Sequence, residues 1–206
     1  MQTLRVDHVG SLLRPEPLKQ AFRDHALGSL SAEALRAAQD KAIRDVIARQ
    51  EALGLPVATD GEYRRLNWQV SFSEVAGWDL WSGSWKKLLQ NPGDKAAHET
   101  PLQKGDDAVL AFRVPATSRL ELVKSFPLGE FAFLKQTATS PTKITPKVTL
   151  MSPDRVAQMC DIDGSRPHYA GADEFLADVV AIQRRMVGEL VEAGCEIGRA
   201  SCRERV

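Results

Sequence analysis

The sequence predicts an α/β protein built from successive β/α units, whose loops lie together at the mouth of a barrel. The polar, glycine-containing stretch 7–15 (DHVGSLLRP) follows a short apolar run and precedes a helical pattern. A second such stretch, 60–65 (DGEYRR), follows the next apolar run. Loops that leave successive parallel strands of a barrel gather at the same mouth, so these two stretches predict one substrate site there.

Composition indicates one medium-sized soluble domain: the chain has 206 residues, of which 43% are hydrophobic, with 27 basic and 27 acidic side chains. This balance gives no broad positive field for nucleic acid. No stretch approaches the roughly 18 apolar residues of a membrane-spanning helix, and the N-terminus lacks the apolar core of a signal peptide. We expect a cytoplasmic protein with neither a nucleic-acid nor a membrane partner.

The three cysteines, Cys160, Cys195 and Cys202, are odd in number and show no C-x-x-C pairing. This usage argues against a disulfide framework and against a zinc knuckle. Cys160 is expected to be a small buried hydrophobe rather than a ligand.

The N-terminal region predicts a strand over residues 4–9 followed by a helix. Pro15 and Pro17 open this helix, because proline is tolerated in the first helical turn, and the helix continues through Leu27.

A clearer helix follows. Ser31 can cap it, apolar residues recur at helical spacing between 35 and 53, and Gly54 and Pro56 end it. The run 55–59 has no polar alternation, as expected for a parallel strand buried on both faces.

All four tryptophans lie between Trp68 and Trp85. They could form a hydrophobic lid on the barrel rim or a platform for a flat ring such as a pterin, and packing is favoured because clustered aromatic side chains usually supply buried area first. The β-prone runs 108–114 and 119–124 predict a hairpin inside an insertion of about 78–140.

The alternation of strands and helices resumes with a third predicted strand over 147–151. Ser152 and the proline after it predict a short helix that reaches Met159. A long helix begins near Asp173 and ends near Gly194.

The last eleven residues, 196–206, are charged and show neither strand alternation nor a buried apolar run. They are interpreted as a non-native tail, so that native sequence covers 1–195; a genuine exposed C-terminal tail is the alternative.

Four separated motifs carry a family resemblance: HVGSLLRP (8–15), TDGEYRR (59–65), VTLMSP (148–153) and EAGC (192–195). Together they resemble the catalytic, C-terminal domain of cobalamin-independent methionine synthase, and more closely its shorter single-domain relatives called methionine synthase II. The resemblance runs from about Leu4 to Cys195. It implies a partial TIM (β/α)₈ barrel, roughly the first three to four β/α units, with a small β insertion.

The activity that this resemblance implies is zinc-dependent methyl transfer from a methylated folate-type donor to the thiol of homocysteine, giving methionine. Zinc suits this chemistry because it deprotonates a coordinating thiol. The zinc ligands of the family, an H-x-C motif, a glutamate and a later cysteine, belong to the second half of the barrel. We therefore expect zinc as a cofactor but assign no metal ligand and no catalytic residue to this chain, which is expected to be inactive and poorly folded alone.

The resemblance also implies how homocysteine is held. Gly10 and Ser11 would bind its carboxylate and Glu62 its ammonium, with glycine allowing close backbone approach. The alternatives are an ordinary helix cap for Ser11 and a solvated loop carboxylate for Glu62.

Four further residues complete the candidate substrate-binding set: His8, Asp60, Arg14 and Arg65. His8 could contact ligand, orient an acidic neighbour, or be a structural histidine at a strand end. The two arginines could hold an anionic group or pair with the carboxylates; pairing is favoured for Arg65, and both remain open for Arg14.

Two other functions fit the same loops. One is a related barrel enzyme that acts on another thiol. The other is a non-catalytic protein that binds an amino acid without the metal-bearing half. Each has small-molecule partners, so a substrate screen separates them.

Overall fold

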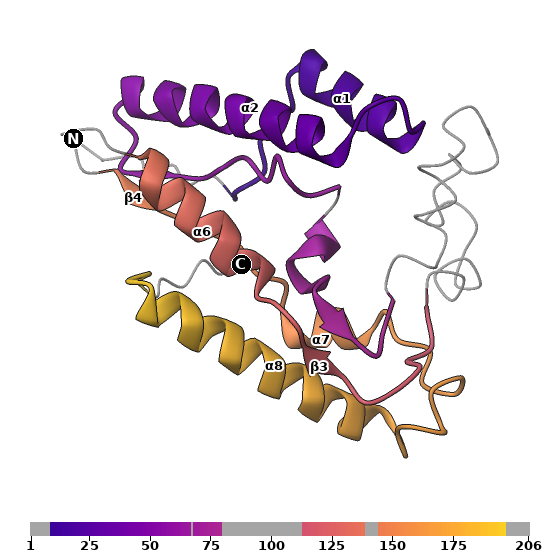
Figure 1. Cartoon of the computed structure of the whole chain (residues 1–206). Helices are drawn as coiled ribbons and strands as arrows, with labels where there is room; N and C mark the ends of the chain where they lie inside the picture. Colours follow the sequence, from indigo (N-terminus) through magenta and orange to yellow (C-terminus); the bar gives the residue numbers. More distant parts are fainter. Residues whose placement is uncertain (1–8, 67, 80–112, 139–143, 197–206) are drawn as a thin grey trace, which may run out of the picture.

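Two long helices, α2 (Ala32–Ala52) and α8 (Ala172–Glu192), lie on either side of α6 (Phe126–Thr137), as Figure 1 shows. The computed structural model describes residues 9–66, 68–79, 113–138 and 144–196. The short strands and the remaining helices fill the space beside these three helices. The predicted α/β class is thereby confirmed.

The helices near the N-terminus follow the sequence prediction. α1 spans Glu16–Ala26 with Pro15 at its N-cap. α2 is capped by Ser31, whose hydroxyl accepts a hydrogen bond from the backbone N–H of Ala34 at 3.1 Å. Residues 1–8, which hold most of the strand predicted over 4–9, lie outside the described residues.

The described strands form two separate two-stranded sheets. β1 (Val57–Ala58) pairs in parallel with β4 (Thr145–Pro146), and β2 (Val75–Ala76) pairs antiparallel with β3 (Glu121–Leu122). β1 confirms a parallel strand within the predicted run 55–59.

The strand predicted over 147–151 is wrong, because the pairing lies at 145–146 and the last ladder bond runs from the N–H of Lys147 to the carbonyl of Ala58, at 2.8 Å. Beyond Lys147, backbone carbonyls accept hydrogen bonds from side chains. Arg65 donates to the carbonyl of Thr149, and Gln183 of α8 donates to that of Met151, each at 2.8 Å.

For the predicted hairpin, the structure describes the second run and only the end of the first. The run 119–124 does contain β3, and β3 pairs with β2. Residues 108–112 lie outside the described part, and Val114 forms an isolated parallel bridge with Cys160. Val75 and Leu122 face each other in the register and are both buried, so core packing selects this pairing. The limits of the insertion remain a prediction.

The larger hydrophobic core, called the first cluster here, lies under α8. Its buried members are Phe72, Val75, Trp78, Val114, Ala116, Leu122, Met151, Val156, Met159, Cys160, Tyr169, Phe175, Val179, Ile182 and Met186. The predicted burial of Cys160 is confirmed.

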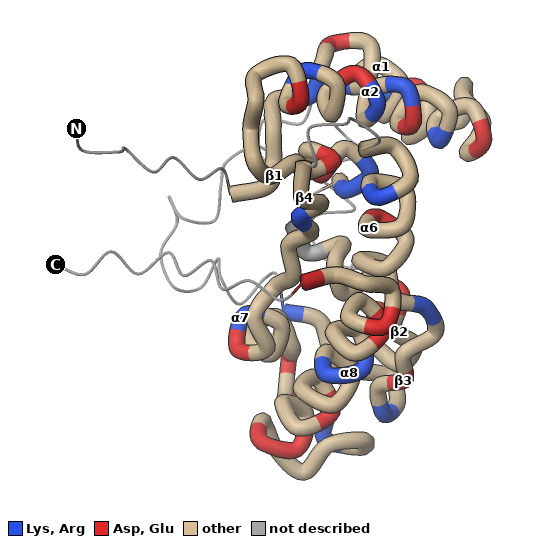
Figure 2. Tube along the Cα trace, turned by 90° about the vertical axis from the view of Figure 1, so that its left-hand side faces the viewer, with Lys and Arg blue, Asp and Glu red and all other residues tan. Residues whose placement is uncertain are grey.

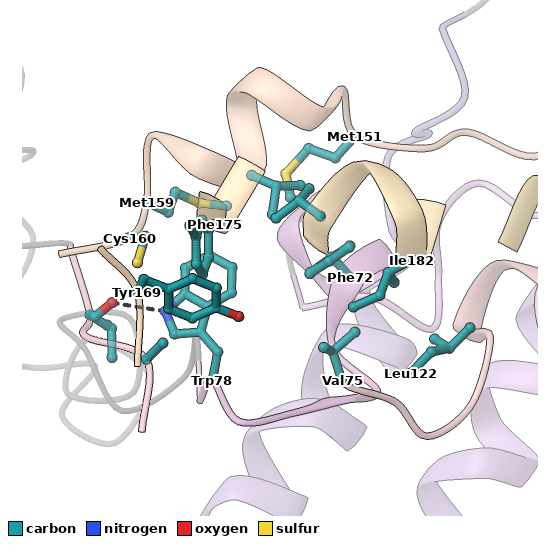
Figure 3. Close-up of a cluster of buried hydrophobic side chains, with 14 of the residues drawn as sticks. Phe72, Val75, Trp78, Leu122, Met151, Met159, Cys160, Tyr169, Phe175 and Ile182 are labelled. Atoms are coloured by element: carbon teal, nitrogen blue, oxygen red, sulfur yellow. Dashed lines mark hydrogen bonds between the residues drawn. The ribbon is translucent and has the colours of Figure 1, made fainter. Parts of the chain in front are cut away.

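Trp78 is central to the first cluster (Figure 3). Its ring packs edge-on against Phe72 and Phe175, with centroids 6.3 Å and 5.1 Å away, and its indole N–H donates to the carbonyl of Val114 at 2.8 Å. The packing interpretation is confirmed for Trp78. Trp81, Trp85 and the side chain of Trp68 lie outside the described residues; Trp68 begins the 3-10 helix η1 (Trp68–Phe72).

The second cluster packs α1, α2 and α6 on the parallel strand pair. Its buried members are Leu18, Ala42, Ile43, Ile47, Ala58, Tyr63, Leu134 and Ile144. This second cluster therefore packs α1 and β1 against α2.

The C-terminal elements match the sequence closely. α7 (Pro153–Ala157) ends two residues before the predicted Met159, and α8 begins with Asp173 and Glu174 in its first turn. Gly194, with φ of 85°, follows the end of α8. The tail predicted over 196–206 lies almost wholly outside the described residues.

Basic and acidic residues are interspersed along the trace of the described elements, with no long stretch of one sign (Figure 2). None of the helices in the described ranges is both long and apolar enough to cross a membrane.

Candidate functional site

The two polar loops that the sequence singles out lie side by side. Ser11 and Gly61 form an isolated parallel bridge, and the N–H of Leu12 donates to the carbonyl of Gly61 at 3.1 Å. From α2, the side-chain amide of Gln50 bonds both backbone groups of Thr59, at 2.8 and 3.0 Å. The loop 60–65 is therefore anchored at its start.

Gly10 occupies a position that only glycine fits. Its φ is +150°, and a Cβ there would lie 2.6 Å from Cγ2 of Thr149 and 3.3 Å from a carboxylate oxygen of Glu62. Its carbonyl accepts a hydrogen bond from the hydroxyl of Thr59 at 2.7 Å. The backbone at Gly10 thus packs directly against the Glu62 side chain.

Glu62 has an unusual backbone, with φ of +58° in the left-handed region. Its N–H donates to Oδ1 of Asp60 at 2.8 Å, and its carbonyl accepts from the guanidinium of Arg14 at 3.1 Å. Its Oε1 accepts from the hydroxyl of Thr149 at 2.7 Å. Its side chain is 13% exposed, so the solvated-loop alternative for Glu62 is wrong.

Arg65 is the buried cation of the site, with 2% side-chain exposure. Its Nε and Nη2 donate to the two carboxylate oxygens of Glu130 at 2.8 and 2.6 Å. Its Nη1 lies 3.4 Å from Oε1 of Glu62 and donates to the hydroxyl of Thr149 at 3.0 Å. Pairing of Arg65 is confirmed, but its principal partner is a residue that the sequence analysis missed.

The signal for Glu130 lies in its own helix. The run Phe126–Leu134 (FPLGEFAFL) is apolar except for this one carboxylate. A lone ionised residue on such a helix is rarely buried unless paired, so it predicts a buried cationic partner without identifying it.

Arg14 donates hydrogen bonds to backbone carbonyls. Its Nη2 donates to the carbonyls of both Glu62 and Arg65, and its guanidinium lies 5.8 Å from the ring of Phe22. These contacts place Arg14 behind the loop, where it fixes the loop's path.

Burial raises the pKa of two carboxyl groups at this site. It raises the pKa of Asp60, whose residue exposure is 5% and whose Oδ2 has no hydrogen-bond partner among the described atoms. Burial also raises the pKa of Glu130 to about 7, with the negative charges of Asp60 and Glu62 adding to the rise and Arg65 opposing it. Three carboxyl groups therefore surround one buried guanidinium.

The site opens into a hollow of about 400 Å³, called the first hollow here. Its lining comes from both loops, from the segment after β4 and from α7: Val9, Glu62, Arg65, Thr149, Leu150, Met151, Ser152 and Arg155. Ser11 is exposed and is not among these lining residues. Pro15 is the N-cap of α1, so the helix-cap alternative for Ser11 is wrong. His8 lies outside the described residues.

The described residues do not fit a zinc ion. Within residues 9–66, 68–79, 113–138 and 144–196 there is no group of three or more histidine, cysteine, aspartate or glutamate side chains that could hold a metal. The described arrangement places a fixed carboxylate and a buried guanidinium at the edge of the first hollow.

The described residues thus form an α/β fold in which the loop after β1, its neighbouring loop and the segment after β4 surround a hollow. No family model matches the chain. The uncharacterized protein YxjH of Bacillus subtilis is 29% identical over 93% of this chain and 46% of its own length. A methionine synthase of Sulfurisphaera tokodaii is 27% identical over 92% of this chain and 48% of its own length.

A solved structure described as a vitamin-B12-independent methionine synthase from Listeria monocytogenes superposes with a TM-score of 0.68 and 23% identity, covering 92% of this chain and 48% of that one. The chain is thus similar over most of its length to proteins named methionine synthase, in agreement with the resemblance of the four motifs. It spans about half the length of the relatives that it matches.

Proposed function

We propose that this chain carries the amino-acid-binding part of a methionine synthase-like methyltransferase, whose methyl acceptor is the thiol of homocysteine. One observation supports this most: the carboxylate of Glu62 is fixed at the edge of the first hollow by Thr149, beside the loop that holds Gly10. A carboxylate held in this way suits the ammonium of an amino acid.

The remaining roles follow from charge and reach. Ser11 would bind the ligand carboxylate through its N–H and hydroxyl, and the absence of a side chain at Gly10 lets ligand approach the backbone. Arg14 and Asp60 would act on the loop by fixing the backbone of Glu62, at 3.1 and 2.8 Å. No catalytic residue is assigned to this chain.

The barrel and its cofactor are part of the same proposal. The parallel β1–β4 pair and the TM-score of 0.68 support the interpretation of the chain as the first β/α units of a (β/α)₈ barrel. When bound, zinc would supply a stabilised thiolate, and a methylated folate would be the methyl donor. Since the described residues do not fit zinc, we derive no step through it and propose that this chain binds the amino acid without turning it over.

Isothermal titration of the 206-residue chain with L-methionine tests the binding role. A charged hydrogen bond contributes roughly 1.5–3 kcal/mol, so Glu62→Gln should weaken methionine binding by about 10- to 100-fold. Glu33→Gln, at an exposed position in the first turn of α2, is the matched control and should bind as the wild type does. Equal affinities for wild type and Glu62→Gln would contradict the proposal.

The choice of thiol needs a second measurement. Zinc, a methylated folate and homocysteine are added to the same protein, with other thiols in parallel. Methyl transfer to a different thiol would favour a related enzyme, and amino-acid binding with no transfer would agree with the binding role.

A further inference from the structure

We propose that Glu130 is a positioning residue of this site, which holds Arg65 back from Glu62 and so leaves the Glu62 carboxylate available to the ammonium of a ligand. This inference rests on the proposed function and deepens it. It concerns specificity for ligands that carry an α-ammonium group.

The nitrogens of the Arg65 guanidinium have different partners. The edge formed by Nε and Nη2 is taken by Glu130, in a two-point contact of 2.8 and 2.6 Å. The remaining nitrogen, Nη1, reaches Thr149 at 3.0 Å and stands 3.4 Å from Glu62. A planar guanidinium that is held at two points cannot rotate, so its distance from Glu62 is set by Glu130.

Loss of the Glu130 charge would change the partner of Arg65. Arg65 and Glu130 are each only 2% exposed in their side chains, so a buried guanidinium without this partner is costly. Of the carboxylates that face it, Glu62 already lies 3.4 Å away. A small rotation of Arg65 would shorten this existing ion pair to hydrogen-bond distance, and the closer pair would compete with the ligand ammonium for the same oxygens.

Thr149 links the same residues by a second route. Its hydroxyl donates to Glu62 at 2.7 Å while it accepts from Arg65 at 3.0 Å. A hydroxyl has a single proton, so accepting from Arg65 directs that proton toward Glu62. Displacement of Arg65 would therefore also loosen the orientation of the Glu62 carboxylate.

The test compares two ligands on the 206-residue chain by isothermal titration at about pH 8, where Glu130 is ionised. One ligand is L-methionine and the other is the analogue of methionine that lacks the amino group. For Glu130→Gln we expect the ratio of the two affinities to fall by about tenfold, because only methionine needs a free Glu62. In the Glu62→Gln background the same substitution should change this ratio little.

Glu174→Gln is the matched control, since it breaks an exposed ion pair with Arg119 that does not involve the site and should leave the ratio unchanged. Glu130→Asp keeps the charge with a shorter reach, so it should lie between wild type and Glu130→Gln; it carries the test if the glutamine variant does not fold. An unchanged ratio in a folded Glu130 variant overturns the inference. Failure of the wild type to bind either ligand overturns the proposed function itself.

Discussion

Gly10 illustrates how a single missing side chain shapes the site. The added Cβ of Gly10→Ala would meet Thr149 at 2.6 Å and would need a φ of +150°. We expect Gly10→Ala to lower the free energy of unfolding by about 1–3 kcal/mol and to weaken methionine binding, because Thr149 must move away from Glu62. Urea denaturation and titration calorimetry measure the two effects.

Gly28→Ala is the control for backbone strain alone. Gly28 also has a positive φ, +76°, but a Cβ there would meet nothing within 4 Å. It should therefore cost stability without affecting ligand binding. Equal losses of binding in both variants would show that the contact at Gly10 is unimportant.

The raised pKa of Glu130, about 7, predicts a specific pH dependence of stability. In the unfolded chain this group titrates near the ordinary 4.5, so between 4.5 and about 7 the folded state binds more protons and its stability falls as pH rises. Glu130→Gln is permanently neutral and lacks this loss. We expect the stability of wild type relative to Glu130→Gln, measured by urea denaturation, to decline from about pH 5 to about pH 7.5.

A relative stability that rises with pH over the same window would mean that the bonds from Arg65 dominate over burial and hold Glu130 ionised in the fold. That result would reverse the predicted pH dependence but keep the contact geometry on which the positioning role depends.

At the scale of elements, the caps of α2 and α6 differ in a way that mutation can detect. The hydroxyl of Ser31 accepts from Ala34 and satisfies one free N–H of α2, so Ser31→Ala should lower the free energy of unfolding by about 1 kcal/mol. The hydroxyl of Ser125, at the N-cap of α6, is buried and has no partner among the described atoms. Ser125→Ala should therefore be neutral or stabilising.

Urea denaturation of both variants measures this difference. A loss at Ser125 as large as that at Ser31 would mean that its hydroxyl does have a hydrogen-bond partner, which would contradict this prediction.

Local signals explain which elements the sequence could predict. Helices α1, α2 and α8 carry prolines, caps or apolar stripes within their own residues, and each was predicted close to its observed bounds. Helix α6 was missed because its residues are apolar on nearly all sides, which gives no helical periodicity. The strands are two residues long each, so their partners are chosen by distant packing that no local pattern records.

The same division holds for the site. The two loops and their proximity could be predicted, since each follows a strand position in the sequence. Glu130 could not be linked to Arg65, because 65 residues separate them and only the packing of α6 brings them together. The residue that pairs with a buried charge depends on the tertiary fold, so the local sequence motif around that charge does not identify it.

At the scale of the whole molecule, the two hydrophobic clusters should differ in how they open. The first cluster includes Phe175 of α8 and the second includes Ile43 of α2, and both residues are fully buried. The clusters have no buried member in common among the described residues, whereas α6 packs on both long helices. Local opening follows such packing units, so each cluster should lose hydrogen-exchange protection largely by itself.

Amide hydrogen exchange on Phe175→Ala and Ile43→Ala tests this division. Removal of each side chain should cost about 2–5 kcal/mol in its own cluster. We expect Phe175→Ala to lower protection along α8 with a smaller effect on α2, and Ile43→Ala to do the reverse. Val187→Ala, at a position on α8 that is 37% exposed, is the control and should change neither helix. Equal loss along both helices in both variants would instead indicate one cooperative unit, in which α6 and the Arg65–Glu130 pair couple the clusters too strongly for either to open alone.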